Sequence, residues 1–174
     1  MKWFWIINLL LFQLCWFSAA LLLEYGALVI LLLIAVHFGL SPTPREDAKL
    51  LLLVPIGVLV DGLLIHSGVF SSTSPQSLGS IDSLFPLWLL LLWAIFAISF
   101  NHSLKWLTRT SFMGVALVGA IGGASSYWAG IKLGRLTTQW NEAELLLLLM
   151  PIWAALLPIL VLSYRKLLHQ HVLR

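Results

Sequence analysis

Asp61 is the residue whose type and position most directly suggest chemistry. It lies near the middle of an apolar segment at about 49–69. An ionisable side chain is costly in lipid and marks a functional site by default. Unless a partner on another segment or water in a cavity solvates Asp61, we expect it to be neutral. If it is neutral, it donates a hydrogen bond, and Gln13 is the natural candidate for the acceptor. The alternative is that Asp61 is a buried packing residue.

A second polar group closes another apolar segment. If this stretch is helical, Asn101 and Lys105 face the same side, because residues four apart are neighbours on a helix. A cation and an amide beside His102 could hold a phosphate or a carboxylate. Alternatively, Lys105 and Trp106 only anchor the segment at a membrane interface. In the first case His102 is the candidate acid/base, with Asp61 or Asn101 orienting a substrate.

Small residues recur along a further apolar segment at about 112–131. Such stripes allow another helix to approach closely, so we predict a helix contact there. The main stripe is Gly122, Ser126, Gly130 and Gly134, and Gly119 and Gly123 form a second pair. Polar side chains on the same segment, at Ser125, Ser126 and Tyr127, could also line a pocket. The candidate ligand-binding residues are Gln13, Asp61, Asn101, His102, Lys105, Ser126 and Tyr127.

The histidines do not predict a metal site. His37, His66 and His102 fall on three different apolar segments and at two depths, so three of them are not expected to share an ion. The chain also has no His-Glu-x-x-His pair, no Gly-x-Ser-x-Gly turn, no phosphate-binding loop and no clustered histidine box. We therefore expect neither a metal nor another cofactor, and the sequence leaves open whether the protein is an enzyme.

The elements that carry these residues must be membrane helices. The chain has 174 residues, of which 60% are hydrophobic and 10% charged. A soluble domain has roughly 45–50% apolar and about 25% charged residues. The composition excludes a soluble globular domain, a disordered chain, a coiled coil and a nucleic-acid-binding module. It indicates an all-α, polytopic helical membrane protein.

Six spans of about 20 residues fit the chain, with short loops and no extramembrane domain. We predict one integral membrane domain over 1–174, and we expect the first apolar run to be retained rather than cleaved. Polar breaks separate the spans. The break at 41–47 ends one helix and caps the next through Ser41, Thr43 and the Glu46-Asp47 pair, while 71–83 is a flexible loop. We detect no internal repeat. The predicted spans are about 3–23, 26–40, 49–69, 85–104, 112–131 and 143–164.

The basic residues predict the orientation of these spans. Six spans place eight basic residues on one side, against Lys132 and Arg135 on the other. Loops rich in Lys and Arg stay in the cytoplasm, so both termini are expected there, in a multi-pass protein of the bacterial inner membrane. The eight residues are Lys2, Arg45, Lys49, Lys105, Arg109, Arg165, Lys166 and Arg174.

Several short motifs together resemble one bacterial family. They include Asp61-Gly62-Leu63-Leu64, Pro86-Leu87-Trp88, Asn101-His102-Ser103-Leu104-Lys105-Trp106-Leu107 and Ser126-Tyr127-Trp128-Ala129-Gly130. Over nearly its whole length the chain resembles the inner-membrane family called domain of unknown function 2878. That family has no established activity. Its genes lie beside genes of fatty-acid modification and membrane stress, so the resemblance implies, by association, a part in lipid modification.

Three functions follow as hypotheses. The leading one is an accessory or lipid-binding component of membrane lipid modification, whose partners are the bilayer, a lipid or fatty-acyl ligand, and a lipid-modifying enzyme. The second is a membrane-embedded lipid-modifying enzyme that uses His102. The third is a small proton-coupled transporter that uses Asp61. None of them involves nucleic acid.

Overall fold

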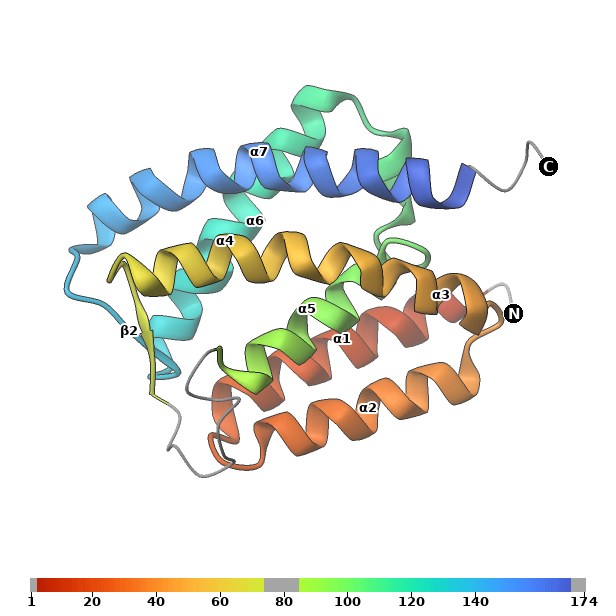
Figure 1. The fold of residues 1–174 in the computed structure, drawn as a ribbon, viewed down its shortest axis with the longest axis horizontal. Helices are drawn as coiled ribbons and strands as arrows, with labels where there is room; N and C mark the ends of the chain where they lie inside the picture. The colour runs from red at the N-terminus through yellow and green to blue at the C-terminus, as the bar shows by residue number, and fades with distance from the viewer. Residues whose placement is uncertain (1–2, 74–84, 170–174) are drawn as a thin grey trace.

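The computed structural model describes residues 3–73 and 85–169, most of them helical (Figure 1). Both ends of the chain lie at the end of the bundle that holds α3, which we call the terminal end, and the short strands lie at the opposite, strand end. The elements are α1 (Phe4–Leu21), α2 (Gly26–Leu40), α3 (Pro44–Leu50), η1 (Leu51–Leu53), α4 (Val54–His66), β1 (Ser71–Ser72), α5 (Leu87–Ser99), η2 (Lys105–Arg109), α6 (Phe112–Lys132), β2 (Leu136–Thr137) and α7 (Glu142–His169).

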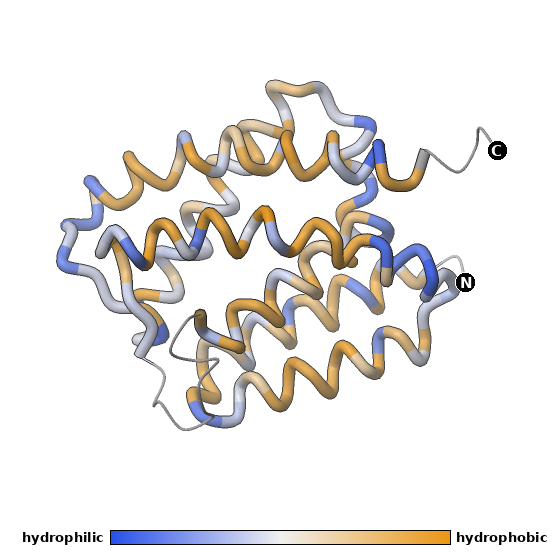
Figure 2. The backbone as a smooth tube through the Cα atoms, in the orientation of Figure 1, coloured by the Kyte–Doolittle hydropathy of each residue, from blue (hydrophilic) through white to orange (hydrophobic). Residues whose placement is uncertain are grey.

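Four helices are long and apolar enough to cross a membrane, which agrees with the prediction of an all-α protein with helices able to span a bilayer. Two more are apolar but short: α2 has 15 residues and α5 has 13. At 1.5 Å per residue they reach about 22 and 20 Å, against a hydrocarbon core of about 30 Å. Polar residues gather toward the helix ends (Figure 2). The four long helices are Phe4–Leu21, Pro44–His66, Phe112–Lys132 and Glu142–Leu168.

The polar break before the third predicted span is not a loop that caps the next helix. Most of it is already part of that helix. Helical structure begins at Pro44 and continues through α3, η1 and α4 to His66, so the charges of the break lie inside its first turns. Thr43 occupies the N-cap but makes no side-chain cap bond. The predicted capping by this segment was therefore wrong, because Asp47 is buried and bonded elsewhere. Of the predicted loop 71–83, the first residues form β1, and 74–83 lie outside the described residues.

The fourth predicted span is shorter than expected. Helix α5 ends at Ser99, whose hydroxyl donates to the carbonyl of Ile95 at 2.8 Å. The chain then turns and enters the short 3-10 helix η2. Asn101 and Lys105 are therefore not neighbours on an α-helix, and the predicted four-residue pairing was wrong. The turn instead directs Asn101 and His102 into the bundle.

Helices α6 and α7 pack through glycine, but not through the predicted main stripe. A Cβ atom at Gly123 would lie 2.0 Å from Cδ2 of Trp153, and one at Gly119 would lie 2.3 Å from the Trp153 carbonyl oxygen. Gly122 has no atom within 4 Å of the same position. The second pair is therefore the close-contact face, since Gly123 leaves space for the indole of Trp153 and Gly119 leaves space for its backbone and for Leu157.

The same glycine–indole packing occurs a second time. A Cβ atom at Gly57 of α4 would lie 2.2 Å from Cδ2 of Trp93 on α5. Trp93 stacks on Trp153, with ring centroids 5.6 Å apart and planes 5° from parallel. Two glycine–tryptophan contacts thus meet in one stacked aromatic pair at the centre of the bundle.

The helices that carry these glycines also end alike. Gly68 after α4 and Gly134 after α6 both have positive φ, which favours glycine. In each case the next amide bonds back to the helix, as in a Schellman cap. Gly57 precedes Gly68 by the same spacing as Gly123 precedes Gly134, and the strands that follow pair antiparallel, Ser71 with Thr137. The structure therefore contains a local repeat that the sequence pattern did not reveal.

Candidate functional site

The terminal end holds a cluster of polar side chains around Asp47. Nε2 of His37, from α2, lies 3.1 Å from Oδ2 of Asp47 on α3. Nε2 of His102, from the turn after α5, lies 2.9 Å from Oδ1 and 3.0 Å from Oδ2. His37 and Asp47 are fully buried, and His102 is nearly so. Three separate elements thus bring two imidazoles to one carboxylate.

Further side chains fix this carboxylate in place. Nδ2 of Asn101 donates to Oδ1 of Asp47 at 2.8 Å and to Oγ1 of Thr43 at 3.0 Å. The hydroxyl of Ser41 donates to Oδ2 of Asp47. The Tyr164 hydroxyl of α7 donates to Oδ1 of Asn101 at 3.4 Å. The cluster therefore ties α2, α3, the end of α5 and α7 together.

Phe4 of α1 closes the cluster with an apolar ring. Its centroid lies 5.3 Å from that of His37 and 4.7 Å from that of His102. One turn further along α1, Oδ1 of Asn8 accepts from the backbone amide of Ser103 at 3.2 Å and from its hydroxyl at 2.5 Å. Helix α1 thus both covers the imidazoles and holds the turn that carries His102. Among the described residues, His37, Asp47 and His102 form a group with the geometry and donor types to hold a metal ion.

Asp61 lies deeper in the bundle and has different partners. The indole N–H of Trp93 donates to its Oδ2 at 2.6 Å, and the hydroxyl of Tyr127 donates to its Oδ1 at 2.5 Å. Asp61 is 1% exposed. The expected pairing with Gln13 was wrong, because partners on two other helices, Trp93 and Tyr127, occupy both carboxyl oxygens. Asp61 connects α4, α5 and α6 beneath the stacked tryptophans.

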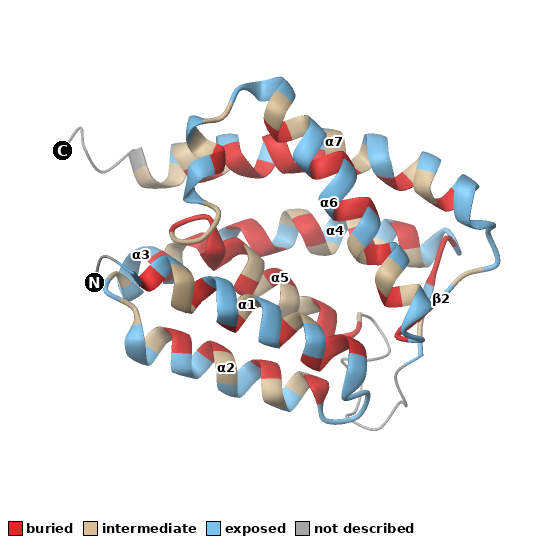
Figure 3. Cartoon of the chain, turned by 180° about the vertical axis from the view of Figure 1, so that it is seen from behind, coloured by how far each residue is buried: buried red, intermediate tan, exposed pale blue. Residues whose placement is uncertain are grey.

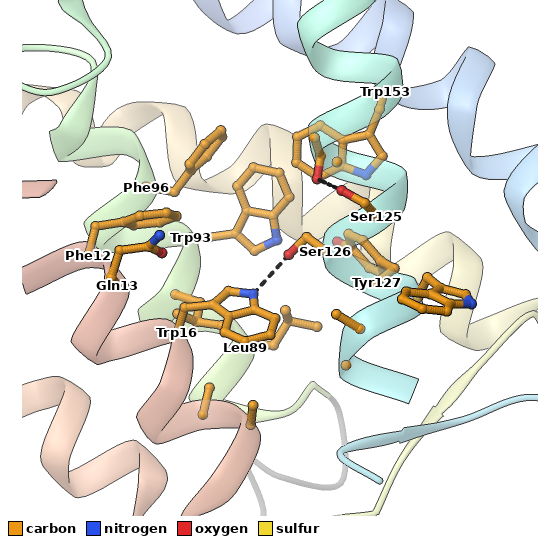
Figure 4. A pocket seen from close by; sticks show the side chains of 18 of the residues that line it. Phe12, Gln13, Trp16, Leu89, Trp93, Phe96, Ser125, Ser126, Tyr127 and Trp153 are labelled. Carbon is orange, nitrogen blue, oxygen red and sulfur yellow. Dashed lines mark hydrogen bonds between the residues drawn. The ribbon is translucent and has the colours of Figure 1, made fainter. Parts of the chain in front are cut away.

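A pocket of about 630 Å³ lies between α1 and α5 on one side and α6 on the other (Figure 4). Its walls are mainly aromatic and aliphatic. Along its rim α1 and α6 are partly exposed, as Figure 3 shows for the outer faces of the helices. The aromatic lining includes Phe12, Trp16, Trp93, Phe96, Tyr127 and Trp153.

A few polar groups interrupt the apolar lining. The indole N–H of Trp16 donates to the hydroxyl of Ser126 at 2.8 Å, which links α1 to α6 across the pocket. Gln13, one turn before Trp16, is exposed and also lines the pocket. Ser125 turns its hydroxyl back to the Gly122 carbonyl at 3.1 Å.

Arg135 forms the strand-end wall of the same pocket. The cap at Gly134 places it just beyond α6, where it is 2% exposed. Nη1 donates to the carbonyl of Leu23 at 3.0 Å, and the guanidinium lies 4.4 Å from the ring centroid of Trp88. The pocket is therefore apolar along its length and positively charged at one end.

The predicted site residues divide between these places. Asn101 and His102 lie together in the Asp47 cluster, whereas Gln13, Ser126 and Tyr127 line the pocket, and Asp61 lies behind its wall through Tyr127. Lys105 is exposed on η2 and joins neither group. The three candidate catalytic residues, His102, Asp61 and Asn101, thus do not form one site.

Two important residues escaped the sequence analysis. Asp47 was assigned to a helix cap, and Trp93 was not singled out. The signal for Asp47 was its place in the predicted topology, which puts His37 at the end of one predicted span, His102 at the end of another and Asp47 at the start of a third, all on the same side. The expectation of no metal site considered only histidines and so omitted this acid.

Searches of curated proteins and of solved structures returned no match for this chain. A family profile does match it, over residues 5–159. That range includes nearly all of α1, the elements α2 to α6, the pocket lining, most of α7, and His37, Asp47, Asn101 and His102 of the cluster, whereas Phe4 and Tyr164 lie outside it. The chain therefore belongs to the family described as protein of unknown function (DUF2878), as its motifs predicted.

Proposed function

We propose that this protein binds a membrane lipid by enclosing one acyl chain in the pocket between α1, α5 and α6. The observation that carries the proposal is the pocket itself. Its volume of about 630 Å³ falls within the range of roughly 300–1,000 Å³ typical of small-molecule sites. Its lining is mostly apolar, with few polar groups, as such sites require.

The position of the opening supports a lipid rather than a soluble ligand. Rim residues on α1 and α6, among them Phe17 and Val118, are apolar and exposed. Both helices are long and apolar enough to cross a membrane. A pocket that opens between two such helices meets acyl chains rather than water.

The polar groups suggest how one lipid would be oriented. Arg135 at the strand end supplies a cation for an anionic headgroup, and the apolar length of the pocket takes the chain. Ser126 and Gln13 offer hydrogen bonds partway along it, which suits a chain that carries an oxygen at that depth. We propose on this basis that the protein serves membrane lipid modification as an accessory, lipid-binding component.

Filling the pocket tests this proposal directly. Gly122 lines the pocket, and a Cβ atom there meets nothing within 4 Å, so Gly122→Phe adds a ring to the pocket without a clash at Cβ. Gly39, on α2, has the same free space but does not line the pocket, so Gly39→Phe is the matched control. We expect wild type and Gly39→Phe to retain one tightly held lipid through delipidation in detergent, measured by native mass spectrometry.

Loss of the retained lipid only in Gly122→Phe would support the proposal. Equal retention in both variants, or no retained lipid in the wild-type protein, would overturn it. Arg135→Gln in the same measurement should shift the retained species from anionic toward zwitterionic lipids.

We further propose that α2 and α5 also cross the bacterial inner membrane, which gives six spans with the terminal end in the cytoplasm. The distribution of basic residues supports this orientation. Reporter fusions after residue 76 should then report the periplasm, and fusions after 47 and 174 the cytoplasm. A cytoplasmic signal at 76 would contradict the six-span arrangement.

A further inference from the structure

We propose that His37, Asp47 and His102 form a binding site for a divalent transition-metal ion at the terminal end of the bundle. Their ligand atoms all lie within 4.8 Å of one another. None of the three residues lines the lipid pocket, so this inference is independent of the proposed function.

The geometry of the cluster suits a shared ion. Atoms that bind one ion at about 2.0–2.2 Å lie about 3 Å or more from each other. The two Nε2 atoms lie 2.9–3.1 Å from the Asp47 oxygens, in that range. Both imidazoles present the same nitrogen, and Nδ1 of His37 is buried with no hydrogen-bond partner among the described residues. The His37 ring is therefore committed to the cluster through Nε2 alone.

The donor types indicate the class of metal. Two imidazole nitrogens and one carboxylate suit Zn²⁺ or Fe²⁺ better than Mg²⁺ or Ca²⁺, which prefer oxygen ligands. Three protein ligands leave at least one coordination position for water or another small ligand. The proposed site thus has an open coordination position at which a ligand can exchange, unlike a closed structural metal site.

The surroundings provide the support that metal sites need. Ligating carboxylates are normally held by outer hydrogen bonds, and Asn101 and Ser41 both donate to Asp47. Tyr164 in turn orients Asn101. Phe4 packs against both imidazoles and limits their rotation. The ligands are therefore held in place before an ion arrives.

Metal binding by the purified full-length protein tests the site. After chelator treatment, Zn²⁺ is titrated in detergent against a chromophoric chelator. We expect one Zn²⁺ per wild-type chain, and binding at least tenfold weaker in Asp47→Asn and His102→Gln. His66→Ala removes a histidine that lies outside the cluster and should bind Zn²⁺ like wild type.

Co²⁺ gives a second readout that needs no variant. Bound to two imidazoles and a carboxylate, it should absorb in the visible range, and the bands should disappear when Zn²⁺ is added. Absence of both stoichiometric Zn²⁺ binding and the Co²⁺ bands in the wild-type protein would overturn the proposal. Unchanged Zn²⁺ affinity in folded Asp47→Asn and His102→Gln would also overturn it.

Discussion

Asp47 and Asp61 lie on one continuous helical run, and both are buried, yet their neighbours differ in kind. Asp47 meets two imidazoles, an amide and a hydroxyl near a bundle end. Asp61 meets an indole and a phenol in the middle of the bundle. At 1.5 Å per residue the two acids are about 21 Å apart along the helix axis.

This difference separates a site that can exchange ligands from a structural connection. An imidazole has a lone pair that can bind an ion, whereas an indole N–H can only donate a hydrogen bond. Asp61 is therefore held by groups that keep its oxygens occupied, and its contacts explain how α4, α5 and α6 stay together. A buried acid inside a membrane bundle need not be the chemically active one.

The largest effect should come from disturbing the tryptophans above Asp61. Gly57→Ala and Gly123→Ala each place a methyl group inside an indole ring, and overpacking of this kind costs about 1–3 kcal/mol. Gly62→Ala and Gly122→Ala, on the same two helices, meet open space and should gain up to about 1 kcal/mol from helix propensity. Melting temperatures in detergent should fall for the first pair and hold or rise for the second. The same change in all four variants would contradict this packing.

Zinc should distinguish the two acids. If the ion binds only the folded protein, saturation at 100 times Kd stabilises it by about 2.7 kcal/mol. Zn²⁺ should therefore raise the melting temperature of wild type and of Asp61→Asn, but not of Asp47→Asn. A zinc shift that survives in Asp47→Asn, or that vanishes in Asp61→Asn, would show that the division between the two acids is wrong.

Replacing Asp61 should cost less. Asp61→Leu leaves the Trp93 and Tyr127 donors unpaired, and we expect a loss of about 1–2 kcal/mol, because hydrogen bonds between membrane helices are individually weak. Asp61→Asn keeps one acceptor oxygen, so its stability should lie between that of Asp61→Leu and that of the wild-type protein. Adding Tyr127→Phe to Asp61→Leu should recover part of the lost stability, because it removes the hydroxyl that Asp61→Leu leaves without an acceptor. Additive losses would instead argue that Tyr127 acts independently of Asp61.

Sequence patterns predicted the bounds of two helices well, because each apolar run is flanked by polar residues. The second apolar segment was predicted at 26–40, and α2 occupies those residues. The fifth was predicted at about 112–131, against Phe112–Lys132 in the structure. The end of α5 was not predictable in this way. The turn after Ser99 depends on the hydrogen bonds that Asn101 and His102 make to Asp47, which lies on another helix.

The same limit applies to the site. A charged Arg-Glu-Asp run after two prolines is typical of a solvated helix start. Asp47 is buried because α2, α3 and the end of α5 pack together around it. Among the glycines, spacing identified both possible contact faces on α6. It could not say that Trp153, far along the chain, would select the pair Gly119 and Gly123.

The matched glycine contacts and helix caps make α4–α5 and α6–α7 a local repeat. The repeat matches α4 with α6 and Trp93 with Trp153, and the strands that follow α4 and α6 pair with each other, Ser71 with Thr137. Asp61 and Tyr127 stand at equivalent positions, since each follows its packed glycine by the same spacing. The two halves of the repeat thus share backbone features but differ in the side chains at these positions. An acid on one side faces a phenol on the other, which leaves the centre of the bundle with a single carboxylate and avoids two that would repel each other.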